Sequence, residues 1–169
     1  MNRRLAYAAV TGLLCLFFAR LFLTQASAHH SSLPNQSLNP RVLALADKAY
    51  HKAKEKGINV TTPAMAIIDY SLPSDKKRLW IVNMDTHRVI FNTLVSHGMG
   101  SGQRRATRFS NRPSTHATSI GLYQAKNTYR GRHGYSLKLI GLDKGFDDNA
   151  ARREIVMHAA NYVNESRAA

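Results

Sequence analysis

The chain contains one cysteine, few acidic residues and no apolar run long enough for a comfortable membrane span. Because Cys15 is its single cysteine, it can form no intrachain disulfide and no zinc site with paired cysteine ligands. Only 10 acidic residues stand against 24 lysines and arginines, so the formal net charge is +14 and attraction to polyanions is expected. The main apolar run, residues 5–19, is 15 residues long and Arg20 follows it, whereas a transmembrane helix needs roughly 20 apolar residues.

The residues on either side of this run are typical of a secretory signal peptide. Arg3 and Arg4 give a positively charged start, and Ala26-Ser27-Ala28 matches a small-x-small cleavage site. We therefore expect a signal peptide over residues 1–28 and a linker over residues 29–39. The mature protein is expected in the periplasm or cell envelope, with no membrane span after cleavage. Cleavage would remove three arginines and no acidic residue, which lowers the formal net charge from +14 to +11.

After the linker, residues 40–169 show the pattern of a β-rich α+β domain. Helical spacing begins at Pro40, with Asn39 as N-cap, and Gly57 ends the helix. The residues expected on its buried face are Val42, Leu45, Ala46, Ala49 and Ala53. Apolar strand patterns occupy residues 65–70, 78–83, 89–95, 120–125, 136–140 and 155–157, with a hairpin turn at 85–87. A short internal helix is expected at 147–154, capped by Asp147 or Asp148.

Three histidines stand at strand ends beside a small residue, where an imidazole can face a cleft. The pairs are His97-Gly98, His133-Gly134 and His158-Ala159. Imidazole is the side chain best suited to proton transfer near neutral pH. A zinc hydrolase or a serine hydrolase using Ser96, Ser101, Ser114 or Ser136 would also employ histidine. However, neither a His-Glu-x-x-His nor a Gly-x-Ser-x-Gly spacing is present, so we expect no metal and no cofactor.

Six segments in a fixed order resemble one family of exported bacterial enzymes. They are IIDYSLPSDKKRLWIVNM, VSHGMGSGQ, FSNRPST, SIGLY, YRGRHGYSLKLIGLD and IVMHAANYV. Over residues 64–163, these segments are similar to the murein L,D-transpeptidase catalytic domain. The resemblance implies a mainly β sandwich or barrel domain that acts on peptidoglycan stem peptides by cysteine acyl transfer.

The resemblance also implies roles for residues of this chain. His158 lies at the position of the catalytic histidine that partners the cysteine thiolate, and Ala159 follows it where glycine is common in the family. Substrate contacts are expected from His97, Gly98, His133, Gly134, Ser136 and Ala159.

The family continues into a Ser-x-Gly-Cys segment that holds the nucleophile, and this segment is not present in the sequence. We therefore expect an inactive or partial domain without its C-terminal strands, which leaves enzyme activity uncertain. Truncation is favoured over a non-catalytic variant. The alternative function is a non-catalytic module that binds peptidoglycan or anionic envelope polymers, with no specific nucleic acid. Its candidate arginines are Arg104, Arg105, Arg108, Arg130 and Arg132.

Overall fold

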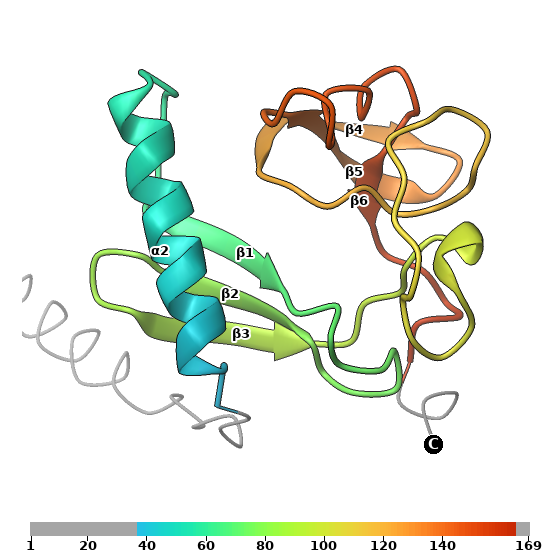
Figure 1. The fold of residues 1–169 in the computed structure, drawn as a ribbon, viewed down its shortest axis with the longest axis horizontal. Helices are drawn as coiled ribbons and strands as arrows, with labels where there is room; N and C mark the ends of the chain where they lie inside the picture. Colours follow the sequence, from blue (N-terminus) through green and yellow to red (C-terminus); the bar gives the residue numbers. More distant parts are fainter. Residues whose placement is uncertain (1–36, 165–169) are drawn as a thin grey trace, which may run out of the picture. The chain divides into compact units, whose positions relative to one another are not determined.

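The computed structural model describes residues 37–164, which contain one α-helix, six β-strands and one 3-10 turn (Figure 1). The predicted signal peptide, Cys15 and most of the predicted linker lie outside these residues. The elements are α2 (Pro40–Glu55), β1 (Ala64–Ile68), β2 (Leu79–Asn83), β3 (Arg88–Thr93), η1 (Met99–Ser101), β4 (Tyr123–Gly131), β5 (Gly134–Gly141) and β6 (Val156–His158). Within residues 37–164, no helix is both long enough and apolar enough to cross a bilayer.

Helix α2 begins where the sequence predicted, because Asn39 and Pro40 form its N-terminus. The Asn39 side chain accepts a hydrogen bond from the Arg41 amide at 2.9 Å, and Pro40 lacks the amide hydrogen that a first turn leaves unpaired. The predicted buried face is wrong at Leu45, which is 68% exposed. The helix instead buries Tyr50 together with Ala46 and Ala53, so the buried face is rotated away from Leu45.

The first sheet has the order β1-β2-β3, and every pairing is antiparallel. Helix α2 crosses one face of this sheet (Figure 1). The core between them is a cluster of Leu38, Ala46, Tyr50, Ile67, Trp80, Val82 and Met84. Strand β2 is central because its backbone pairs with both β1 and β3, and its Trp80 and Val82 belong to this same cluster.

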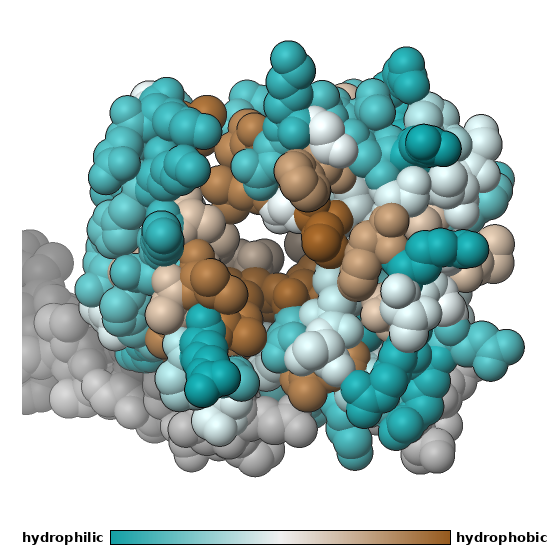
Figure 2. Space-filling view, in the orientation of Figure 1, coloured by the Kyte–Doolittle hydropathy of each residue, from teal (hydrophilic) through white to brown (hydrophobic). Residues whose placement is uncertain are grey.

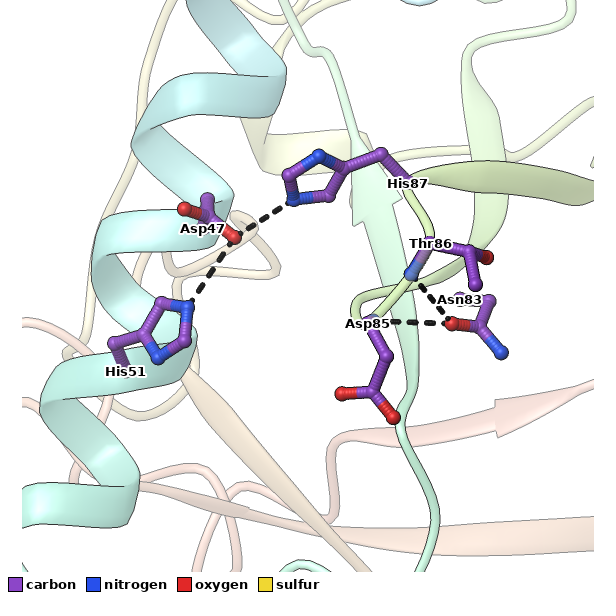
Figure 3. A network of polar contacts seen from close by, with 6 residues as sticks. All are labelled: Asp47, His51, Asn83, Asp85, Thr86 and His87. Atoms are coloured by element: carbon purple, nitrogen blue, oxygen red, sulfur yellow. Dashed lines mark hydrogen bonds and ion pairs between the residues drawn. The ribbon is translucent and has the colours of Figure 1, made fainter.

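A tight turn joins β2 to β3, which confirms the predicted hairpin. The side chain of Asn83 accepts hydrogen bonds from the amides of Asp85 and Thr86, both at 3.0 Å. The turn also reaches α2: Asp47 lies between two imidazoles (Figure 3). Its Oδ1 is 3.0 Å from His87 Nε2 and 3.6 Å from His51 Nε2.

The second sheet has the order β4-β5-β6 and is also antiparallel. Strand β4 starts at Tyr123, so the prediction of a strand from residue 120 is wrong at its first three residues. Gly121 explains the difference: its φ is +154°, and an added Cβ would lie 2.3 Å from Asp147 Oδ2. The chain approaches Asp147 closely at this point and enters the sheet only afterwards.

The internal helix predicted at 147–154 is wrong, because these residues form consecutive turns. Their backbone hydrogen bonds mix spacings of three, four and five residues, as in Ala150 to Asp147 and Ile155 to Ala150. Tertiary contacts stabilise this irregular path: Arg153 Nη1 donates to Ser110 O at 2.6 Å, and its Nη2 donates to Ala117 O. The segment is therefore bound to the loop before β4.

The fold is mainly β with one α-helix, which confirms the β-rich class. Among the described elements, no Cα atom of α2, β1, β2 or β3 lies within 8 Å of a Cα atom of the second sheet. A loop connects them: Gln124 Nε2 of β4 donates to Asn59 O, in the loop before β1, at 3.4 Å. Figure 2 shows a central hollow, lined largely by hydrophobic residues, between the side carrying α2 and the side carrying the second sheet.

Candidate functional site

His158 is the last residue of β6, the edge strand that pairs with β5. Three pairs define the register, with Ser136 opposite His158 and Lys138 opposite Val156. His158 is half-buried, so part of the residue is open to solvent. Strand pairing therefore fixes the backbone of His158 while leaving its ring accessible.

The hydrogen bond of His158 selects its tautomer. Its Nδ1 lies 2.8 Å from the carbonyl oxygen of Ala159, an acceptor only, so Nδ1 carries the hydrogen and donates it. In the neutral ring, Nε2 then has a lone pair that can accept a proton. This is the arrangement that a general base requires.

His133 stacks on His158. The ring centroids are 4.4 Å apart and the planes differ by 21°. His133 lies in the two-residue turn that connects β4 to β5, between the paired residues Gly131 and Gly134. Gly134 has a φ of +77°, which glycine adopts without strain and which lets the turn close tightly enough to place His133 over β6.

Ser136, which pairs with His158 across β5 and β6, is buried, with 3% of its surface exposed. Its Oγ donates to Gly134 O at 3.3 Å, not to His158. The structure therefore brings together His133, Gly134, Ser136 and His158, with Ala159 following directly. Their roles in catalysis and substrate binding stay predictions.

His97 and Gly98 belong to a different set of contacts. Both ring nitrogens of His97 are engaged: Arg78 Nη2 donates to Nδ1 at 2.8 Å, and Nε2 donates to Gly102 O at 3.1 Å. The amide of Gly98 donates to Thr118 Oγ1 at 2.9 Å. A Cβ at Gly98 would lie 2.2 Å from His116 O, so this glycine permits two loop segments to touch.

Arg78 organises that second set, and sequence reasoning did not single it out. It is fully buried, donates to Val95 O through Nε and Nη2, and donates to Leu72 O at 2.9 Å. Its guanidinium also lies 5.1 Å from the centre of the Tyr70 ring. Burial lowers the pKa of Arg78 and raises the pKa of Tyr70. The sequence feature that could have indicated a buried Arg78 is its position at the start of the apolar run RLWIV.

Neither a thiol nor a metal-binding cluster occurs in the part of the chain that the structure describes. Residues 37–164 contain no cysteine, and no three His, Cys, Asp or Glu side chains among them are arranged to hold a metal ion. What these residues offer is an imidazole base on a sheet edge. Such a base acts on a nucleophile that another group supplies.

An open cleft of about 520 Å³ lies elsewhere, lined by residues that include Lys56, Gly121, Asp143 and Phe146. The lining does not include His158. Asp143 already accepts a hydrogen bond from the Leu122 amide at 2.8 Å. The cleft thus lacks a base and nucleophile pair, and we place the candidate chemistry at His158.

A comparison with protein families matches residues 34–169 to a family model described as an L,D-transpeptidase catalytic domain. The matched range includes every residue of both sheets and both sets of contacts around His158 and His97. Neither a curated protein nor a solved structure matches this chain.

Proposed function

This chain belongs to the L,D-transpeptidase catalytic domain family, and on that premise we propose that its second sheet forms the histidine side of a peptidoglycan acyl-transfer site. The family acts on peptidoglycan stem peptides. The observation that carries the proposal is the geometry of His158, whose Nδ1 donates to Ala159 O and whose Nε2 is left as a proton acceptor.

The proposed reaction is nucleophilic acyl transfer. A cysteine thiolate attacks the carbonyl that joins the diamino acid of a stem peptide to its terminal D-alanine. His158 accepts the thiol proton and passes it to the departing D-alanine amine, and an acceptor amine or water then releases the acyl group. Backbone amides would stabilise the oxyanion.

The nucleophile is the part of this reaction that the given residues do not supply. Cys15 is the single cysteine, and it lies in the predicted signal peptide. We therefore propose that the 169 residues bind stem peptides in the envelope after export but do not transfer acyl groups unaided.

Binding of anionic envelope polymers is the alternative function. Part of its proposed surface is already engaged within the chain: Arg104 pairs with Asp75 at 2.7 Å, Arg105 donates to Ser71 O, and Arg108 donates to Gly100 O. These three arginines form contacts between loops of the chain itself. Stem-peptide binding at His158 is therefore the function that the contacts favour.

The proposal is tested with a stem tetrapeptide ending in D-alanine and free D-methionine as acceptor, followed by mass spectrometry. The chain and its Cys15→Ser variant are both expected to give no exchange product. A fusion that places a family Ser-x-Gly-Cys segment after Ala169 is expected to give product, and His158→Gln in that fusion should remove at least about 99% of the rate, the size of a general-base contribution. Product from the unfused Cys15→Ser protein would contradict the cysteine mechanism.

A further inference from the structure

One face of the second sheet carries a continuous row of side chains across all three strands. Tyr129 of β4 pairs with Ser136 of β5, and Ser136 pairs with His158 of β6. Because directly opposed residues of antiparallel strands project to the same side, the three side chains share one face. His158 thus ends a row that begins with an aromatic ring.

Lys138 lies next to this row on the same face. It is two residues beyond Ser136 on β5, so its side chain points to the same side. Its Nζ lies 5.5 Å from the centre of the Tyr129 ring, within the range of a cation–π contact. The residue is exposed, and no carboxylate of residues 37–164 forms an ion pair with it. Tyr129 therefore positions an ammonium group whose charge is available to a ligand.

The two arginines of the hairpin do not share this placement. Arg130 neighbours Tyr129 and pairs with Tyr135, so it projects from the opposite face. Arg132 lies in the turn beyond the paired residues. Lys138 lies on the same face as His158, diagonally across the pair of strands β5 and β6. Cα atoms in such a diagonal pair are about 7–8 Å apart.

We propose that Lys138 is a specificity-determining residue that binds the terminal carboxylate of the D-alanine in a stem peptide. This rests on the proposed function, since the scissile carbonyl is placed beside His158. Three bonds separate that carbonyl carbon from the D-alanine carboxylate carbon, a span of about 4 Å. An anion at that distance from the imidazole falls within reach of the Lys138 side chain. Lysine binds it as a point charge, without the geometric demands of a guanidinium.

The test measures dissociation constants by calorimetry for the 169-residue chain with two probes. One is the tetrapeptide L-alanyl-γ-D-glutamyl-L-lysyl-D-alanine, and the other is its C-terminal carboxamide. Because both probes keep the glutamyl carboxylate, they differ only in the terminal charge. We expect the unmodified chain to prefer the carboxylate about three- to fivefold, the range of an exposed ion pair.

Lys138→Met is expected to bind the two probes with about equal affinity, since methionine keeps the apolar stem and removes the charge. Lys126→Met is the matched control: it removes one exposed positive charge from β4 and should retain the preference. Far-UV circular dichroism verifies that both variants are folded. A preference that persists in Lys138→Met, or that both variants lose equally, would overturn the assignment to Lys138. No heat from either probe with the unmodified chain would contradict stem-peptide binding itself.

Discussion

Asp147 is a fully buried carboxyl group with one oxygen that has no hydrogen-bond partner. Its Oδ1 accepts from the Asp143 amide at 2.7 Å, whereas Oδ2 has no partner. Burial raises the pKa of Asp147 above its ordinary value of 3.8, and the charges of Asp143 and Asp148 raise it further. Folding therefore shifts the equilibrium of this carboxyl group toward its protonated form, relative to the unfolded chain.

Because the folded pKa is the higher one, Asp147 reduces the free energy of unfolding as pH rises above about 3.8, and the loss is complete above the folded pKa. Asp147→Asn should remove this loss. We expect it to raise the free energy of unfolding near pH 7 by about 1–3 kcal/mol, because the neutral amide removes the cost of burying a charged carboxylate. Urea titrations at pH 4 and pH 7 measure the effect, which should be larger at pH 7.

Asp148→Asn is the matched control, since Asp148 is exposed and both of its contacts use Oδ1 as an acceptor, which asparagine retains. It removes only a neighbouring charge that raises the pKa of Asp147, so it should stabilise the protein less than Asp147→Asn does. Equal stabilisation by both substitutions would show that general charge reduction is responsible. An unchanged or lower stability of Asp147→Asn at pH 7 would contradict the account of the buried carboxyl group.

Single residues also show where sequence reasoning stops. His97 and His158 have the same local signature, an imidazole near a strand end followed by a small residue. The structure separates them, because Arg78 donates to His97 from 19 positions away while His158 bonds to its own neighbour. A contact across that sequence distance leaves no local pattern to read. The same holds for Lys138: the alternating pattern of β5 can be seen in the sequence, but the contact of Lys138 with Tyr129 cannot.

At the scale of elements, two kinds of contact attach α2 to the first sheet. One is the packing of Tyr50, which is 7% exposed, among core residues that include Trp80. The other is the network of Asp47 with His87 and His51 in Figure 3, where the Asp47 side chain is 32% exposed and the histidines are 50% and 59% exposed. Solvent screening weakens the second kind.

We expect Tyr50→Ala to lower the free energy of unfolding by about 3 kcal/mol, because it removes buried ring contacts and leaves a cavity. Asp47→Ala, in the same helix, should lower it by less than about 1 kcal/mol. Urea titration at pH 7 with the same probe compares the two variants. If Asp47→Ala proves the more damaging substitution, the exposed network and not the core attaches the helix.

Elements were predictable where local pattern and tertiary packing agree. The cap at Asn39, the helix that follows it and the apolar alternation of β1, β2 and β5 could be read directly from the chain. The segment 147–154 could not, since its helical appearance is overridden by Arg153 bonding to the loop before β4. Gly121 is a related case: its close approach to Asp147 delays β4, and neither residue signals the other in sequence.

For the whole molecule, the two sheets have different roles. The first sheet and α2 hold the main hydrophobic core, while the second sheet carries the row from Tyr129 to His158. Loops fastened by buried Arg78 and by Arg153 connect them. The formal net charge of +14 is expected to draw the protein toward anionic surfaces, and this attraction adds to any site-specific contact. A measurement that locates binding on the molecule therefore distinguishes stem-peptide binding from this general attraction.

That measurement is a nuclear magnetic resonance titration of the isotope-labelled chain with the D-alanine-terminated stem tetrapeptide, read residue by residue. The account predicts saturable shifts centred on Ser136 and His158, extending to His133, while His51 and His87 on the α2 side serve as unmoved references. Shifts centred instead on the cleft near Lys56 and Phe146, or no saturable shifts at all, would contradict the assignment of stem-peptide binding to the second sheet.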